Sequence, residues 1–231
     1  MSGGTHSDGR RVIVAEFADN PLEGIEKHLS LVPMERPDPS KLSPNDVVIA
    51  VKSASVGWVD LLMTSGQYQH MPKPPYCPGL EYAGVVEWKG EAAGNEISVG
   101  DEVYVDGLLA GPRSLGAYQA YGGYASWAVA PGEAVRRVPP GLSLDQACNL
   151  LGNYETAYHC LVARGRVRAG ETVLVHGASG STGLAAVHVA KLLGAIVIAT
   201  GRSDDKLAVV KAQGADHVIN CKSTDDERGV R

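Results

Sequence analysis

Three glycines spaced three residues apart constrain this chain more than any other feature of its sequence. Gly177, Gly180 and Gly183 lie between a short apolar segment, Thr172–His176, and an amphipathic segment, Leu184–Leu193. An apolar run of this length is typical of a buried parallel strand, and the amphipathic segment of a helix that covers it. The order of strand, glycine-rich turn and helix predicts one unit of a parallel α/β sheet.

The glycine turn is suited to binding a dinucleotide. Glycine allows the backbone to turn sharply and to approach a pyrophosphate, whose negative charge then lies at the N-terminus of the following helix. A tight strand–helix turn without a ligand remains the alternative. We expect the cofactor-binding turn to consist of Gly177, Ala178, Ser179, Gly180, Ser181, Thr182 and Gly183.

The end of the second expected strand, Ala195–Thr200, indicates which dinucleotide is bound. NAD sites place Asp or Glu there to hold the ribose 2′-hydroxyl. Here Arg202 and Ser203 follow instead, with Lys206 one helical turn later, and these groups can bind a 2′-phosphate. The sequence therefore favours NADP(H). In the alternative, Arg202 and Lys206 belong to a solvated helix start beside two aspartates.

The rest of the chain divides into two regions of different texture. Residues 1–141 contain short β-rich segments separated by Gly, Pro and Asn, which predicts a small irregular barrel. Residues 142–231 alternate strands and helices, beginning with a helix whose N-cap is Ser143 and whose capping-box partner is Gln146. The expected strands are Val12–Ala15, Asp46–Lys52, Gly84–Trp88, Glu102–Val105, Tyr124–Ala130, Ala134–Val138 and His217–Asn220, and a further helix is expected over Ser203–Gln213.

Composition excludes several classes of protein. The formal net charge of −5 argues against a general nucleic-acid binder. The polar N-terminus is not a signal peptide, and no apolar stretch approaches the roughly 20 residues of a membrane span. A cytoplasmic protein with reduced thiols is expected, although mitochondrial targeting is left open. No two cysteines have metal-knuckle spacing, and Cys148 and Cys160 are expected to be small core residues.

Several ordered segments resemble the zinc-independent quinone oxidoreductase (zeta-crystallin-like) branch of the medium-chain dehydrogenase/reductase superfamily. The segment 53–68, SASVGWVDLLMTSGQY, is similar to the substrate loop of that family, and 78–86, PGLEYAGVV, to its PGxExxGVV motif. The segment 153–158, NYETAY, looks like its TAY helix, and 176–191 like its glycine motif and helix. The resemblance implies a GroES-like domain over 1–141 and a partial Rossmann NADP-binding domain over 142–231.

The resemblance also bears on metal binding. Zinc-dependent relatives place a Cys before the substrate-loop Asp and a His before the Glu of their GHE motif. Gly57, before Asp60, and Leu80, before Glu81, occupy those positions here, and neither side chain can bind zinc. No metal is therefore expected, and Asp60 is expected to brace the substrate loop.

The implied reaction is hydride transfer from NADPH to a quinone or an α,β-unsaturated carbonyl. Tyr68 is the candidate donor to the substrate carbonyl oxygen, where negative charge builds up; a packing role is the alternative. Thr156 and Tyr158 are placed near the nicotinamide, or else in the core. Two other functions stay open: a non-catalytic NADPH-binding protein like the structural zeta-crystallins, and an enoyl-thioester reductase.

The resemblance further implies a shortened chain. Family members have roughly six parallel strands in the nucleotide domain, whereas three are expected here. We therefore expect an N-terminal fragment that lacks the C-terminal strands, in which Thr172–His176 becomes an edge strand. Activity is expected of a longer form, and full-length relatives are expected to be homo-oligomers.

Overall fold

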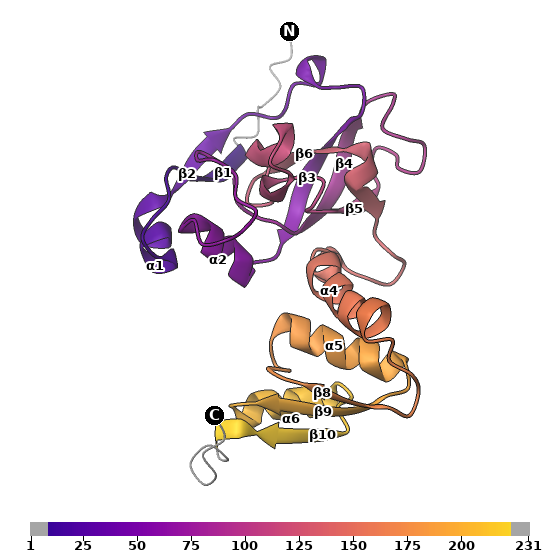
Figure 1. Ribbon diagram of the computed structural model, residues 1–231. Coiled ribbons are helices and arrows are strands. Elements are labelled where there is room, and N and C mark those ends of the chain that lie inside the picture. The colour runs from indigo at the N-terminus through magenta and orange to yellow at the C-terminus, as the bar shows by residue number, and fades with distance from the viewer. Residues whose placement is uncertain (1–8, 223–231) are drawn as a thin grey trace. The chain divides into compact units, whose positions relative to one another are not determined.

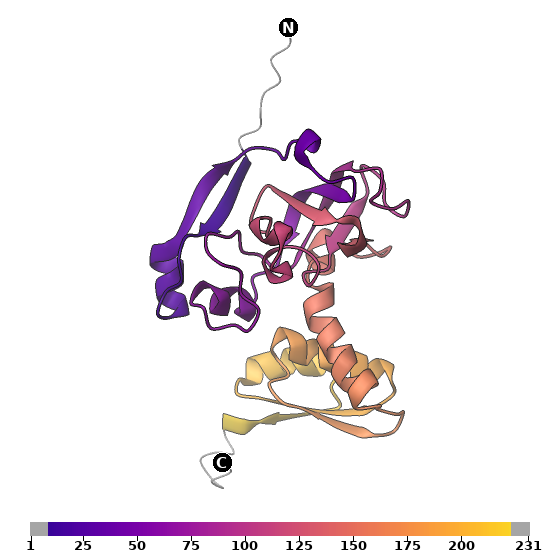
Figure 2. The same ribbon diagram turned by 45° about the horizontal axis from the view of Figure 1, so that its top comes forward.

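The computed structural model describes residues 9–222 and divides into two compact units, residues 1–149 and 150–231. In Figures 1 and 2 the first unit is coloured from indigo through magenta, and the second from orange to yellow. The sequence placed the boundary at 141/142, but the helix α3 (Leu144–Ala147) belongs to the first unit. Ala147 and Cys148 cluster with Ala83 of the first unit, which explains the later boundary.

The first unit is built mainly from β-strands. A five-stranded antiparallel sheet has the order β6-β3-β4-β5-β7, and β1 pairs with β2 in a two-stranded sheet. Isolated bridges join Arg11 to Ala125 and Val14 to Tyr76, tying β1 to the rest of the unit. The strands are β1 (Gly9–Val14), β2 (Leu29–Met34), β3 (Asp46–Ala54), β4 (Tyr82–Lys89), β5 (Glu102–Val105), β6 (Trp127–Pro131) and β7 (Val135–Arg137).

Short helical elements connect these strands. The longest is α2 (Trp58–Thr64), which begins at the expected substrate loop. The others are α1 (Pro21–Glu23), the π-helical turn η1 (Gly24–His28), and the 3-10 turns η2 (Pro39–Lys41), η3 (Pro112–Ser114), η4 (Ala117–Ala120) and η5 (Gly132–Ala134). A core of buried aliphatic residues from β3, β4, β5 and β6, including Val47, Ile49, Val86 and Val103, holds the sheet together.

The second unit is the expected α/β arrangement. Its three parallel strands, β8 (Thr172–Val175), β9 (Ile196–Gly201) and β10 (His217–Asn220), have the order β10-β9-β8. This order is the 3-2-1 half of a doubly wound sheet, with β8 at one edge as the sequence predicts. The helices α5 (Ser181–Leu192) and α6 (Asp204–Ala212) lie on one face of the sheet (Figure 2). A third helical run consists of η6 (Leu151–Glu155), α4 (Thr156–Tyr158) and η7 (His159–Arg164).

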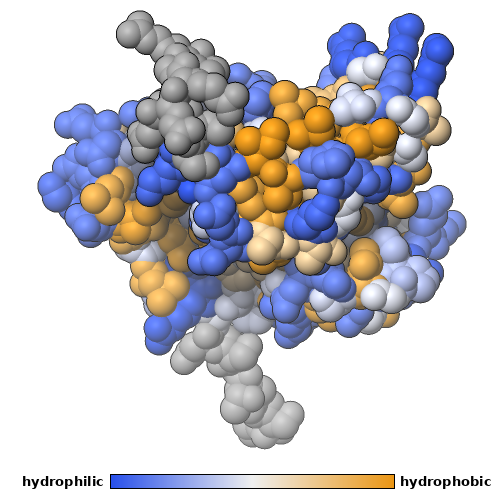
Figure 3. Space-filling view, turned by 90° about the horizontal axis from the view of Figure 1, so that it is seen from below, coloured by the Kyte–Doolittle hydropathy of each residue, from blue (hydrophilic) through white to orange (hydrophobic). Residues whose placement is uncertain are grey.

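The other face of this sheet carries apolar side chains that no other described residue covers completely. Leu174 of β8, Ile196 of β9 and Ile219 of β10 are each more than 40% exposed, and Figure 3 shows hydrophobic surface gathered on this side of the molecule. The covered face packs Val175, Val197 and Ala199 against α5. Among the described residues, no helix combines the length and the apolar character needed to cross a membrane.

Asp216 connects three elements of the second unit. Its carboxylate accepts hydrogen bonds from the Lys191 ammonium of α5 at 2.8 and 3.1 Å, and from the Val197 N–H of β9 at 2.7 Å. The Lys191 contact, followed by the Val197 N–H, lowers the pKa of Asp216 below its ordinary value. The carboxylate form is therefore favoured by the fold.

Asp216→Asn is expected to lower the melting temperature at neutral pH, because the folded state then loses a favoured charge. A lowered pKa contributes stability that is present above the ordinary value of 3.8 and is lost as the pH falls through the lower folded value. The difference from wild type should thus shrink in acid. Thermal melts from neutral to acidic pH test this, with the exposed Glu155→Gln as a control; a deficit that persists unchanged in acid would refute it.

Candidate functional site: a glycine turn and a substrate loop

The glycine turn between β8 and α5 is as tight as the sequence predicts. Gly177 has a φ of 62°, in the left-handed region that favours glycine. A Cβ on Gly183 would lie 2.5 Å from the Gly177 carbonyl oxygen and 2.8 Å from the Ala178 Cα. The helix therefore starts in contact with the turn, and only glycine fits at position 183.

The first turn of α5 offers free backbone donors. Gly180 is the N-cap and provides no side-chain acceptor. The first helical hydrogen bond runs from the Leu184 N–H to the Gly180 carbonyl at 2.8 Å. The three preceding N–H groups, those of Ser181, Thr182 and Gly183, have no partner within the helix. Such a helix start binds an anionic group readily.

The remaining residues of the turn have different surroundings. Ala178 is fully buried, and its N–H donates to the Thr200 carbonyl at 3.0 Å, so it fixes the turn to β9. Ser179 is exposed. The Thr182 hydroxyl donates to Asn153 Oδ1 at 3.0 Å, which connects the start of α5 to η6.

The three polar residues after β9 lie together at the start of α6. Ser203 is the N-cap, and its hydroxyl accepts the Lys206 N–H at 3.5 Å. Arg202 and Lys206 are exposed, and no side-chain hydrogen bond or ion pair of either is found among residues 9–222. Two cationic groups are thus available beside a strand end that has no carboxylate.

His176 and Thr200 form a contact that the sequence analysis missed. His176 directly follows β8 and Thr200 is the penultimate residue of β9, at the same edge of the sheet, and His176 Nδ1 lies 3.1 Å from Thr200 Oγ1. The contact borders the glycine turn, because Thr200 also accepts the Ala178 N–H. The signal was available: both polar residues terminate apolar strands at the carboxyl edge, where α/β sheets bind ligands.

Thr156 and Tyr158 lie on the short helix α4. The Thr156 hydroxyl donates to the Gly152 carbonyl at 2.7 Å, within its own helical run. Both side chains are exposed, Tyr158 by 57%. The core position of this segment is Ala157, which is 1% exposed. Core packing, the alternative role considered for Thr156 and Tyr158, is therefore not what these two side chains do within this unit.

In the first unit, Tyr68 lies in a partly buried aromatic environment. It packs against the buried cluster of Val14, Met63, Tyr76 and Leu80. The guanidinium carbon of Arg113 lies 5.9 Å from the centre of its ring. His70 makes an edge-on contact at 6.2 Å between ring centres. Sequence reasoning missed Arg113, which comes from the distant turn η3.

Asp60 holds together the segment in which a substrate loop was expected. One carboxylate oxygen accepts the Gly57 N–H at 3.0 Å, and the other accepts the N–H groups of Gly79 and Leu80 at 3.2 and 3.1 Å. The side chain thereby caps α2 and ties it to the PGLE segment. Burial raises the pKa of Asp60, and these backbone donors oppose the rise.

Asp60→Ala is expected to destabilise the protein by about 3 kcal/mol, because it leaves the buried N–H groups of Gly79 and Leu80, and the part-buried one of Gly57, without an acceptor. Chemical denaturation at neutral pH measures the effect. The matched control is Asp145→Ala, since Asp145 is exposed and its carboxylate makes no hydrogen bond that the structure records. Equal stabilities for the two variants would show that the Asp60 bonds contribute little.

The cysteines and potential metal ligands complete the description of the site. Within residues 9–222, no three His, Cys, Asp or Glu side chains are grouped as a metal site requires. The described part of the chain contains no disulfide. Cys148 is buried as expected, but the expectation for Cys160 was wrong: it is exposed on η7, where Leu161 takes the buried position.

Comparison with known families identifies both units. The alcohol dehydrogenase GroES-like domain matches residues 43–140, and the zinc-binding dehydrogenase family matches residues 181–230. Together the two matches cover more than half of the chain.

Individual relatives agree with these matches. Human quinone oxidoreductase is 35% identical over 176 residues, covering 76% of this chain and 50% of the relative. An alcohol dehydrogenase of Geobacillus stearothermophilus is 31% identical, covering 91% of this chain and 65% of the relative. The chain thus spans about half the length of the curated quinone oxidoreductases it matches.

Solved structures show the same relationship. A probable oxidoreductase from Mycobacterium abscessus superposes with a TM-score of 0.76 at 35% identity, over 96% of this chain and 66% of that one. The Escherichia coli quinone oxidoreductase complexed with NADPH gives 0.76 at 26% identity, over 92% and 59%. A GroES-like domain followed by a Rossmann-like domain, as predicted, is therefore the fold, and the chain belongs to the quinone oxidoreductase branch of the medium-chain dehydrogenase/reductase superfamily.

Proposed function

We propose that this chain binds NADPH through its second unit and serves the reduction of a quinone or an α,β-unsaturated carbonyl without zinc. The observation that carries the proposal is the uncapped start of α5 against the glycine turn, with Arg202 following β9. The quinone oxidoreductase relatives, and the NADPH complex of the Escherichia coli protein, support it.

The residues of the second unit fit an NADPH molecule. The N–H groups at the start of α5 that have no partner within the helix would bind the pyrophosphate. Because residue 183 is glycine, the start of the helix can lie against the turn without a side chain between them. Arg202 and Lys206 would bind the 2′-phosphate, with the Ser203 hydroxyl beside them. Bound NADPH would supply the hydride for the reaction.

The first unit would contribute Tyr68, whose hydroxyl would interact with the carbonyl oxygen of the substrate. As hydride reaches the conjugated system, negative charge develops on the carbonyl oxygen, and the Tyr68 hydroxyl donates a hydrogen bond or a proton to it. One hydride and one proton complete the reduction, so the balance requires no further reductant. The Arg113 cation beside the ring would favour any negative charge left on Tyr68.

The chemistry of the donor positions supports a zinc-free reaction. Gly57 and Leu80, at the positions where zinc-dependent relatives carry Cys and His, have no side-chain donor atom. Asp60, the remaining acidic group of the loop, accepts three backbone hydrogen bonds instead.

Loss of NADPH absorbance in the presence of 1,4-naphthoquinone tests the proposal on the purified chain. Turnover that depends on both the quinone and the protein would support it. The second candidate is a non-catalytic NADPH-binding protein, which we retain because the match covers only 50% of human quinone oxidoreductase. Tight NADPH binding without turnover on quinones or enals would favour it. A strong preference for acyl thioesters would instead indicate an enoyl-thioester reductase.

A further inference from the structure

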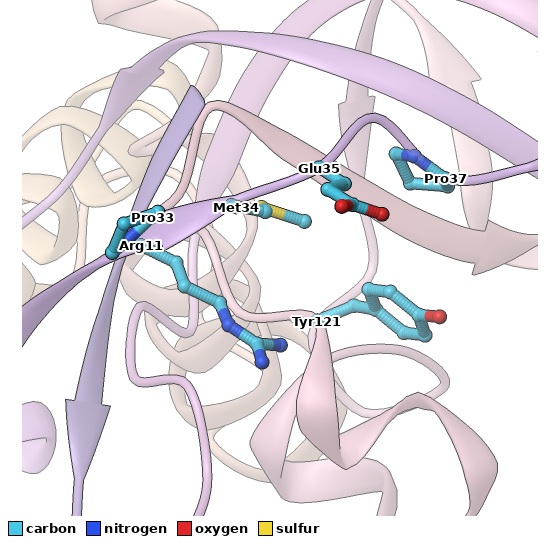
Figure 4. Close-up of a pocket in the computed structure, with 6 residues that line it drawn as sticks. All are labelled: Arg11, Pro33, Met34, Glu35, Pro37 and Tyr121. Atoms are coloured by element: carbon cyan, nitrogen blue, oxygen red, sulfur yellow. The ribbon is translucent and has the colours of Figure 1, made fainter. Parts of the chain in front are cut away.

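An open pocket in the first unit lies outside every residue that the proposed reaction uses. Its volume is about 350 Å³, at the low end of the range for small-molecule sites. Figure 4 shows it between the start of the chain's β-structure and the segment that follows η4. The lining residues are Arg11, Pro33, Met34, Glu35, Pro37 and Tyr121.

Arg11 presents a cation without a counterion to this pocket. Its Nε is buried and has no hydrogen-bond partner among the described residues, and its guanidinium points into the space in Figure 4. The Arg11 charge lowers the pKa of the Cys77 thiol, but burial outweighs this effect and raises that pKa to about 11. The thiol is therefore neutral at physiological pH and is not a counterion for Arg11. Because Nε is closed to solvent, a ligand in the pocket would meet the terminal nitrogens of the same guanidinium, which carry its charge and can donate hydrogen bonds to a carboxylate.

Glu35 supplies the opposite charge on the same pocket. No ion pair or hydrogen bond joins its carboxylate to Arg11 within residues 9–222, although both line one cavity. A purely anionic ligand would be attracted by Arg11 and repelled by Glu35. A ligand with both a carboxylate and an ammonium group would be attracted by both.

The uncharged lining residues are Pro33, Met34, Pro37 and Tyr121, of which Met34 is largely buried. Figure 4 shows the Tyr121 ring beside the same space, where an aromatic ring could pack against it. An aromatic or other apolar body between the two charged ends would bury this surface.

We propose that Arg11, Glu35 and Tyr121 form a binding site for a small zwitterion of the amino-acid or dipeptide type with an aromatic side chain. Arg11 binds the carboxylate, Glu35 binds the ammonium group, and Tyr121 stacks on the aromatic body. The site does not depend on the proposed reductase function, since none of its residues takes part in that reaction.

Isothermal titration with glycyl-tryptophan, its N-acetyl form and its C-terminal amide tests the site. The unmodified dipeptide should bind most tightly, and each capped form about fivefold or more weakly, because each loses one charge contact. Equal binding of all three, or no binding of the dipeptide at millimolar concentration, would overturn the proposal.

Variants assign the two charges separately. Arg11→Gln should abolish the preference for the free carboxylate, and Glu35→Gln the preference for the free amine, each leaving the other preference intact. Arg10→Gln is the matched control, because Arg10 neighbours Arg11 on β1 but does not line the pocket. If Arg11→Gln fails to fold, the exposed Glu35 variant and the capped ligands still decide the question; loss of both preferences in the Arg10 variant would contradict the assignment.

Discussion

Replacement of Gly183 by Val is expected to abolish measurable NADPH binding at concentrations that saturate the wild type. A Cβ at this position lies 2.5 Å from the Gly177 carbonyl oxygen, so α5 must move away from the turn that would hold the pyrophosphate. Overpacking of this kind costs about 1–3 kcal/mol, which corresponds to about 5- to 150-fold in a binding constant. The extra methyl groups of Val place the loss at the upper end.

Leu192→Val provides the control for this prediction. Leu192 is the last residue of the same helix, 86% exposed, and not part of the glycine turn, so its replacement should leave NADPH binding unchanged. NADPH titration followed by nucleotide fluorescence, with circular dichroism as a check on folding, compares the variants. If a folded Gly183→Val protein bound NADPH as the wild type does, the turn would not be the phosphate site.

Tyr68→Phe is expected to lower the turnover number for a quinone or an enone by about 10²- to 10³-fold, the usual effect of removing a donor to a developing oxyanion. The phenyl ring preserves the packing against Val14, Met63 and Leu80, so stability and NADPH affinity should change little. Steady-state kinetics at saturating NADPH measure the effect.

Two further observations separate catalysis by Tyr68 from packing. Tyr68→Leu removes the ring as well as the hydroxyl, so a packing role predicts that Leu is far worse than Phe, whereas a catalytic role predicts similar activities. Arg113→Met removes the cation 5.9 Å from the ring centre, so it should lower the turnover number if the Tyr68 hydroxyl carries negative charge during the reaction, and leave it unchanged if Tyr68 only packs. A fully active Tyr68→Phe enzyme would leave Tyr68 with packing alone.

Much of the second unit could be predicted because its signals are local. The strand His217–Asn220 matches its predicted bounds, as does Glu102–Val105 in the first unit. Ser143 and Gln146 form the predicted capping box. Apolar runs, caps and glycines fix such elements from neighbouring residues alone.

The first unit was harder because its decisive contacts join distant segments. The strand β2 was not predicted, since Pro33 lies within it and weakens the strand pattern. The helix α2 was interpreted only as a loop, although Asp60 caps it. The placement of Arg113 over Tyr68, and the pocket between Arg11 and Glu35, depend on tertiary packing that no local pattern encodes.

Cofactor choice also has a local sequence signal, in the segment after β9. Arg202 stands where an NAD-binding chain would carry a carboxylate, and Lys206 follows on α6. In the structure both side chains are exposed and make no ion pair with another described residue. They remain available for a phosphate, as the central claim requires.

Titration of the wild type and of Arg202→Glu with NADPH and with NADH tests that claim most directly. The wild type should bind NADPH more tightly than NADH, and the variant should lose about 10- to 150-fold in NADPH affinity, the value of a charge-assisted contact of about 1.5–3 kcal/mol. NADH affinity should stay nearly constant. Equal affinity of the wild type for both dinucleotides, or an unchanged preference after the charge reversal, would contradict the account.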